Sequence, residues 1–148
     1  EFRRVLFRSI IRGASGSGKT TLARRLADKL FAPYYEADMW MRDTIGNYAF
    51  DPARLPECHA NCQAAVADIL SQGRDCIVSN TSIKLWEVDK YIDLADKYGA
   101  TLVIIKCTGE FENTHGVPAE RVRAMRENYE TDPNEVLAHE FCRYVFGI

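Results

Sequence analysis

Eight consecutive residues near the N-terminus constrain the fold of this chain more than any other feature. Residues 13–20 read Gly-Ala-Ser-Gly-Ser-Gly-Lys-Thr and fit the pattern G-x-x-x-x-G-K-[ST] at every position. Two isoleucines precede them as the end of a strand, and apolar residues with helical spacing follow. Glycines allow backbone N–H groups to converge on phosphate oxygens, and the start of a helix adds partial positive charge. In this context the pattern predicts a phosphate-binding loop between a strand and a helix.

The chemistry of this loop assigns a role to each of its side chains. The ammonium of Lys19 is expected to reach the β- and γ-phosphates of ATP, and the hydroxyl of Thr20 is expected to ligate Mg²⁺. The residues predicted to bind nucleotide are Gly13, Ala14, Ser15, Gly16, Ser17, Gly18, Lys19, Thr20 and Thr21. The predicted cofactors are therefore ATP and Mg²⁺.

Strand and helix patterns alternate along the rest of the chain. A strand ends at residues 10–11 and is followed by predicted helices at 19–30, from 51–52 to about 73, at 84–98, from 118 and at 134–146. Further strands are predicted at 34–37, 76–79 and 101–107, and residues 39–50 form a loop with a helical turn. Strands separated by helices form βαβ units and a parallel sheet. The fold class is α/β: a three-layer P-loop NTPase/kinase fold with a small parallel sheet.

Length, charge and cysteine content limit the number of domains and the classes of partner that the chain can have. The 148 residues carry 19 Lys and Arg against 21 Asp and Glu, a near-neutral balance that argues against wrapping long nucleic acid. One domain is predicted, at residues 10–148. Residues 1–9 are basic, lack an initiator Met and an apolar signal-peptide core, and place Arg3, Arg4 and Arg8 where a buried strand should lie. We interpret them as a non-native or disordered segment. Five cysteines, an odd number, favour free thiols and a cytoplasmic location; no membrane partner is expected.

A phosphate-binding loop alone does not identify the reaction, because ATPases, GTPases and kinases share it. The chain is short for GTPase switch elements and has no N-K-x-D guanine motif. These features favour a kinase that acts on a small substrate or on a strand end.

Further motifs make a resemblance specific. They are residues 35–40 (Tyr-Glu-Ala-Asp-Met-Trp), His59, residues 77–81 (Ile-Val-Ser-Asn-Thr) with Trp86 and Glu87, and residues 113–118 (Asn-Thr-His-Gly-Val-Pro) with 123–125 (Arg-Ala-Met). With the phosphate loop they span residues 10–130, and over this length the chain resembles the P-loop polynucleotide-kinase-like family. That family includes phage-type 5′-hydroxyl polynucleotide kinases and related small AAA-labelled ATP-binding proteins.

The resemblance implies a general base and a lid. An aspartate at the end of the second strand is the family's base toward the acceptor hydroxyl, and Asp38 occupies this position; capping of the turn at 39–43 is the other interpretation of Asp38. Residues 109–118 correspond to a lid that excludes water. His59 is expected to face the acceptor cleft, and His115 lies in the lid, with a structural role or a place near ATP.

Three positions depart from the family pattern. Met41 replaces an arginine that follows the base, Asn80 replaces an acid after the third strand, and Glu112 replaces a lid arginine. Arginine normally neutralises charge at the transferring phosphoryl group. Among the arginines of the segment after the lid, at 121, 123 and 126, Arg123 matches an arginine of the pattern and is the predicted catalytic one; a solvated helix face is the alternative.

Two groups of residues leave alternatives open. Trp40, Tyr48 and Phe50 surround the predicted base and either stack a nucleobase or fill a cavity over the sheet edge. Cys58, His59 and Cys62 lie within about one helical turn, where packing is a better explanation than a zinc site that lacks a fourth ligand.

The sequence therefore predicts an ATP-dependent kinase that transfers the γ-phosphoryl group to a hydroxyl, with a nucleic acid 5′-OH end as the first-choice acceptor. The predicted catalytic residues are Asp38, Lys19 and Arg123, with Thr20 on Mg²⁺. A nucleoside, sugar or other small-metabolite kinase is the nearest alternative. A nucleotide-binding module without catalysis is the alternative from another class.

Overall fold

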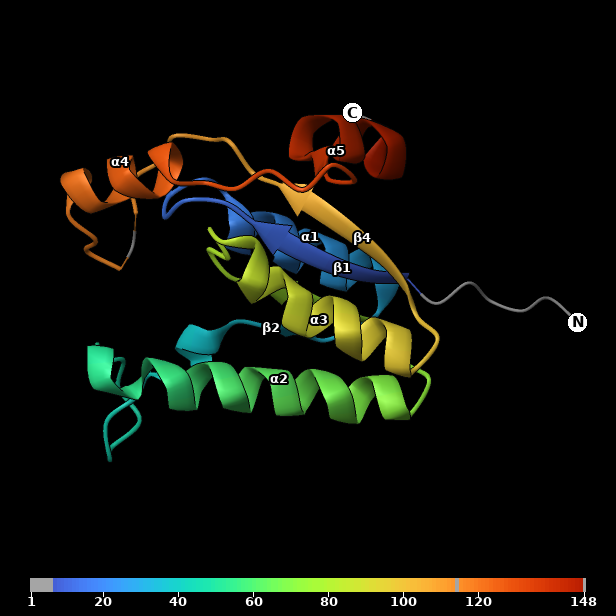
Figure 1. Cartoon of the computed structure of the whole chain (residues 1–148), viewed down its shortest axis with the longest axis horizontal. Coiled ribbons are helices and arrows are strands. Elements are labelled where there is room, and N and C mark those ends of the chain that lie inside the picture. Colours follow the sequence, from blue (N-terminus) through green and yellow to red (C-terminus); the bar gives the residue numbers. More distant parts are fainter. Residues whose placement is uncertain (1–6, 114, 148) are drawn as a thin grey trace, which may run out of the picture.

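Five parallel strands form one sheet, which carries the helices and loops of the chain (Figure 1). The computed structural model describes residues 7–113 and 115–147. The strands are β1 (Phe7–Arg12), β2 (Tyr34–Tyr35), β3 (Cys76–Ser79), β4 (Thr101–Lys106) and β5 (Val136–Leu137), in the order β2-β3-β1-β4-β5. Every neighbouring pair is parallel. The prediction of an α/β fold with a small parallel sheet is confirmed, and the phosphate loop follows the central strand.

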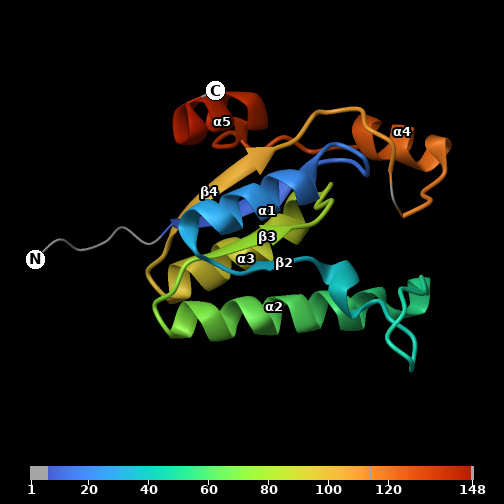
Figure 2. The same cartoon turned by 180° about the vertical axis from the view of Figure 1, so that it is seen from behind.

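Helices cover both faces of this sheet (Figures 1 and 2). Helices α1 (Lys19–Leu30) and α5 (Ala138–Phe146) pack on one face, and α2 (Leu55–Ser71) and α3 (Leu85–Lys97) pack on the other. Side chains along β1 alternate between the two layers: Ile10 belongs to the core with α2 and α3, and Ile11 to the core with α1 and α5. Helix α4 (Ala119–Glu127) buries no residue fully. None of the helices in the described part of the chain has the length and apolarity needed to span a bilayer.

The first strand begins earlier than the sequence predicts. Residues 7–9 pair with β3 and β4, so the expectation that they lie outside the folded domain is wrong for them; residues 1–6 lie outside the described residues. The poor fit expected of Arg8 is nevertheless visible. Its side chain is 3% exposed, Nη1 lies 3.8 Å from Asp75 Oδ1, and neither Nε nor Nη1 has a hydrogen-bond partner among the described residues.

Short elements account for the other differences. The strand predicted at 34–37 is limited to Tyr34–Tyr35, and the 3₁₀ turn Ala37–Trp40 follows it. The helix predicted at 134–146 contains β5 before α5 begins at Ala138. A two-residue strand has no periodicity to detect, and β5 exists because Val136 pairs with Ile105. The predicted opening at 51–52 is present, since Asp51 accepts a hydrogen bond from Ala53 N at 3.0 Å.

The five cysteines are free thiols, and four of them are buried. Cys58 and Cys62 are both 0% exposed in the core beneath α2, which supports the packing interpretation over a zinc site. Burial raises the pKa of Cys76 to about 12 and that of Cys107 to about 11, so both thiols stay protonated at neutral pH.

Candidate active site

The phosphate loop adopts the backbone conformation that its glycines permit. Gly16 and Gly18 have positive φ values of 77° and 97°, and Gly18 is the N-cap of α1. A side chain at Gly16 would collide with the carbonyl oxygen of Phe111, 2.5 Å from the position of an added Cβ. The N–H of Gly13 donates to the carbonyl of Thr81 at 3.1 Å, which fixes the loop to the segment after β3. The loop therefore has the strand–loop–helix context that phosphate binding requires.

Lys19 and Thr20 begin helix α1, and both side chains are held by polar contacts. Lys19 Nζ donates to the carbonyl of Ala14 at 2.9 Å, within the loop. Burial lowers the pKa of Lys19, and interactions with Cys107, then Glu36, then Asp38 oppose this shift. Thr20 Oγ1 donates to Glu36 Oε1 at 2.7 Å. The half-buried ammonium of Lys19 thus experiences the charge of two carboxylates, Glu36 and Asp38, that follow β2.

Asp38 lies in the 3₁₀ turn Ala37–Trp40, at the carboxyl end of β2. Asn80, which follows β3, holds this turn because its Oδ1 accepts a hydrogen bond from Ala37 N at 2.8 Å. The Asp38 side chain is 42% exposed, and its Oδ2 lies 3.2 Å from Nδ1 of His115. The predicted base is therefore half-buried and in contact with a lid residue, and its charge acts to raise the pKa of Lys19.

The predicted lid contacts both the phosphate loop and the turn that carries Asp38. Gly109 N donates to Ser17 O at 3.2 Å, and Phe111 N donates to Gly16 O at 2.8 Å. Farther along, Asn113 Oδ1 accepts from Val117 N at 2.7 Å, which closes a turn; Thr114 lies outside the described residues. The lid segment 109–118 thus runs from the phosphate loop to His115 beside Asp38.

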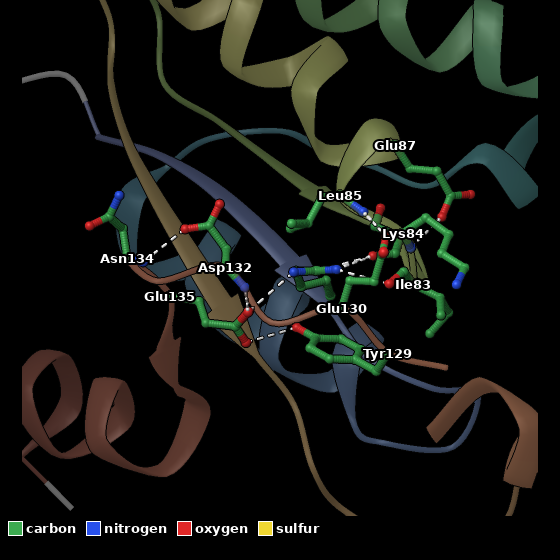
Figure 3. Close-up of polar contacts among 11 residues, drawn as sticks. Ile83, Lys84, Leu85, Glu87, Tyr129, Glu130, Asp132, Asn134 and Glu135 are labelled. Atoms are coloured by element: carbon green, nitrogen blue, oxygen red, sulfur yellow. Dashed lines mark hydrogen bonds and ion pairs between the residues drawn. The ribbon is translucent and has the colours of Figure 1, made fainter. Parts of the chain in front are cut away.

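The segment that follows helix α4 is anchored by a buried polar network, in which Figure 3 labels Tyr129, Asp132 and Glu135. Arg12, the last residue of β1, is 0% exposed and donates to Ser82 O at 2.6 and 3.0 Å and to Glu135 Oε1 at 3.2 Å. The ring of Tyr129 lies 4.2 Å from the Arg12 guanidinium carbon and 4.3 Å from Lys106 Nζ, and its hydroxyl donates to Glu135 Oε2 at 2.8 Å. This network joins Arg12, the residue before the phosphate loop, to the segment after helix α4.

Of the positions that depart from the family pattern, Met41 has a structural explanation in local packing. Met41 is 0% exposed and belongs to the core with α2 and α3. Arg42 beside it donates to the carbonyls of Met39 at 3.3 Å and Gly46 at 3.1 Å. Glu112 is exposed. Met41 is therefore a core residue, and the guanidinium of Arg42 beside it is held by backbone carbonyls.

The three arginines near helix α4 have different environments. Arg121 and Arg123 are both exposed. Arg126 donates from Nη2 to Gly109 O at 3.1 Å and pairs with Glu110 at 3.2 Å. It therefore contacts the start of the lid segment, which hydrogen-bonds to the phosphate loop. The catalytic role of Arg123 stays a prediction.

The aromatic residues near Asp38 divide into two groups. Trp40 packs against Tyr35, with ring centroids 6.4 Å apart, and lies at the edge of the core. Tyr48 and Phe50 are 39% and 49% exposed in a hairpin closed by the Arg42–Tyr48 bridge. The Tyr48 ring meets His115 edge-on at 5.2 Å. Trp40 therefore fits the cavity-filling interpretation, and Tyr48 and Phe50 are left available to a ligand.

The remaining predicted residues are also located. Thr21 is exposed on the first turn of α1, Ser17 is buried in the loop, and Ser15 Oγ donates to the sulfur of Met125 at 3.7 Å. His59 is half-buried on α2. Sequence reasoning did not find Glu36 as the partner of Thr20, and only its place two residues before Asp38 could have suggested it.

The strand order, the phosphate loop after the central strand and the lid that reaches the turn after β2 define a P-loop kinase-like fold. The chain belongs to the AAA_33 family, described as an AAA domain, which matches residues 9–144.

Known relatives and structures agree with this class. Uncharacterized protein PM0531 of Pasteurella multocida (strain Pm70) is 33% identical over 146 residues, covering 86% of this chain and 80% of that protein. The structure of the Mycobacterium tuberculosis APS kinase CysC in complex with AMPPNP and APS is similar with a TM-score of 0.62, 15% identity and 96% of each chain covered. The structure of the Pnkp1/Rnl/Hen1 complex gives a TM-score of 0.65 and 17% identity over 93% of this chain.

The lengths of some structural relatives differ from that of this chain. The chain covers 48% of the matched chain of the Pnkp1/Rnl/Hen1 complex and 61% of a protein from Chloroflexus aurantiacus J-10-fl, to which it is similar with a TM-score of 0.58. At identities of 15–22% these structures establish the fold of the present chain.

Proposed function

We propose that the chain is an ATP-dependent phosphotransferase that moves the γ-phosphoryl group of ATP to a hydroxyl acceptor. One observation carries the proposal: the segment that hydrogen-bonds to Gly16 and Ser17 of a complete phosphate loop also brings His115 to 3.2 Å from the Asp38 carboxylate. The fold shared with the APS kinase, which was determined with AMPPNP, supports ATP as the nucleotide.

In the proposed reaction Asp38 accepts the proton of the acceptor hydroxyl as its oxygen bonds to the γ-phosphorus. The bond between that phosphorus and the β,γ-bridging oxygen breaks, and ADP leaves. The loop amides and Lys19 neutralise charge on the phosphates, and Arg123 from α4 is proposed to add to this when the lid closes. Mg²⁺, when bound with the nucleotide, supplies further neutralisation.

The donor set is compatible with Mg²⁺. Among the described residues there is no group of three or more His, Cys, Asp or Glu side chains that could hold a metal ion by themselves. A phosphate-bound Mg²⁺ does not require such a group, because it keeps several waters and takes only one or two protein ligands. Thr20 is the residue proposed to ligate it.

A nucleic acid 5′-OH end is the acceptor we propose first. The resemblance of residues 35–40 and 113–118 to polynucleotide kinases supports it, and the exposed rings of Tyr48 and Phe50 suit base stacking. The free thiols support a reducing compartment such as the cytoplasm.

A specific observation favours a second candidate, a small metabolite with an uncharged hydroxyl. Met41 is buried where the family carries an arginine, and the guanidinium groups of Arg42 and Arg54 donate to backbone carbonyls. Fewer cations are therefore offered to an acceptor phosphate than in the family pattern.

Phosphate transfer from γ-labelled ATP tests these alternatives. The protein is incubated with Mg²⁺ and a 5′-hydroxyl oligonucleotide, and then with a panel of nucleosides and sugars. We expect labelled oligonucleotide, with a rate about 10²- to 10⁴-fold lower in Asp38→Asn. Asp89→Asn, an exposed acid on α3, is the matched control. Label on a small acceptor alone would select the second candidate. Binding of ATP without transfer to any acceptor would contradict phosphotransfer and leave a nucleotide-binding module.

A further inference from the structure

The acid that P-loop proteins place after the strand beside β1 is missing from this chain. In such proteins the Ser or Thr of the loop and an aspartate together hold Mg²⁺. The equivalent segment here ends in Asn80, whose amide oxygen accepts from Ala37 N at 2.8 Å and whose Nδ2 lies 3.8 Å from Cys62 Sγ. Asn80 carries no charge; its amide oxygen holds the turn after β2, and its amide nitrogen contacts Cys62 on α2.

A carboxylate from the segment after β2 supplies the negative charge that Asn80 lacks. Glu36, which follows β2, accepts the hydroxyl hydrogen of Thr20 at 2.7 Å. A threonine hydroxyl has one hydrogen and two lone pairs, so a hydrogen committed to Glu36 leaves oxygen lone pairs for a cation. Glu36 also precedes Asp38 among the carboxylates that act on Lys19.

We infer that Glu36 is the positioning carboxylate of the magnesium site, in place of the acid that Asn80 replaces. Glu36 orients the Thr20 hydroxyl and supplies the negative charge next to it, and Asn80 fixes the backbone from which Glu36 projects. This inference rests on the proposed function only in assuming that the loop binds Mg²⁺ with a nucleoside triphosphate or diphosphate. It assigns different roles to two acids that are two residues apart. Glu36 acts at the magnesium site, and Asp38 acts on the acceptor hydroxyl.

Metal binding tests this assignment without a phosphotransfer assay. Mn²⁺ is titrated into the full chain saturated with ADP, and bound Mn²⁺ is measured by electron paramagnetic resonance; ADP affinity is measured by calorimetry with and without Mg²⁺. We expect Glu36→Gln to weaken Mn²⁺ binding by about 10- to 100-fold and to lower the Mg²⁺ enhancement of ADP affinity similarly. Glutamine still offers an oxygen to the Thr20 hydroxyl, so weaker Mn²⁺ binding would be due to the lost negative charge of Glu36. ADP affinity without Mg²⁺ should stay near that of the wild type.

Two variants act as matched controls. Asp38→Asn removes the neighbouring charge and should keep Mn²⁺ affinity within a few-fold of the wild type. The double variant Glu36→Gln/Asn80→Asp returns a carboxylate to the position after β3, keeps an oxygen for Ala37 N, and should recover at least part of the lost affinity. Circular dichroism confirms that each variant is folded, and the double variant decides the question if Glu36→Gln alone does not fold.

The outcomes separate this inference from the proposed function. Unchanged Mn²⁺ affinity in Glu36→Gln would overturn the inference, and so would equal losses in Glu36→Gln and Asp38→Asn, because the effect would then be one of general charge. A wild-type chain that binds Mn²⁺·ADP through Glu36 but phosphorylates no acceptor would refute the phosphotransfer and support the assignment of Glu36.

Discussion

Replacing Arg12 by methionine tests whether the buried network in Figure 3 stabilises the fold. Arg12 and Glu135 have side chains that are 0% and 5% exposed, with Nη1 and Oε1 3.2 Å apart. Methionine would leave the Glu135 carboxylate buried without its cation and would remove the donors to the carbonyl of Ser82. Removal of one partner from a buried ion pair costs about 3–5 kcal/mol. A urea dependence of about 2 kcal/mol per molar turns this loss into a midpoint about 1.5–2.5 M lower.

Urea unfolding followed by circular dichroism measures the change. Glu135→Gln and the double variant Arg12→Met/Glu135→Gln complete a cycle, in which we expect the double variant to be less destabilised than the sum of the single ones by about 0.5–3 kcal/mol. Arg24→Met is the control, because Arg24 is an exposed residue of α1 that bonds only to Tyr34 among the described contacts, and its midpoint should not move. A loss below about 1 kcal/mol for Arg12→Met, or an additive cycle, would refute the reasoning.

Three further predictions concern the nucleotide site and the lid. Lys19→Ala should weaken ATP binding by at least about 10-fold in calorimetry, through loss of a charge-assisted bond, while circular dichroism stays unchanged; retained affinity would mean that the phosphates bind elsewhere. Because burial lowers the pKa of Lys19 in the folded state, the unfolded chain binds more protons between that pKa and 10.5, so wild-type stability relative to Lys19→Met should rise with pH across this interval. A flat or falling difference in urea midpoints as the pH is raised from 8 to 10.5 would contradict the burial argument. His115→Ala removes the contacts to Asp38 and Tyr48 and should speed amide hydrogen exchange in residues 115–117, and unchanged exchange would show that other contacts hold the lid.

The fold was predictable where local pattern and tertiary packing agree. The glycine–lysine motif, the helical spacing of Leu22, Leu26 and Leu30, and the β-branched run at 103–105 each specify one element and its buried face. The two-residue strands β2 and β5 could not be predicted from local pattern, because they form only through pairing with β3 and β4. The early start of β1 was missed because arginine is rarely buried, and the rule that buried charges need partners is only half satisfied at Arg8.

The candidate site shows a similar division. The loop residues and the place of Asp38 at a strand end follow from motif and spacing, since the carboxyl ends of parallel strands share one edge of a sheet. Contacts between distant residues do not follow. Arg12 and Glu135 are 123 residues apart in sequence, and the contact of Thr20 with Glu36 depends on which strand neighbours β3. The catalytic role of Arg123 stays a prediction, while Arg126 contacts the lid segment at Gly109.

The burial of Met41 also limits how this protein's substrate range can change. A guanidinium introduced at a position with no solvent exposure would have to be desolvated among the apolar side chains beneath α2, which disfavours the folded state before any new ligand is gained. Single-step evolution or engineering toward an anionic acceptor is therefore more accessible from the exposed hairpin, for example at Ile45, which is 80% exposed. Libraries that vary this hairpin should yield altered acceptor preference more often than libraries that vary position 41.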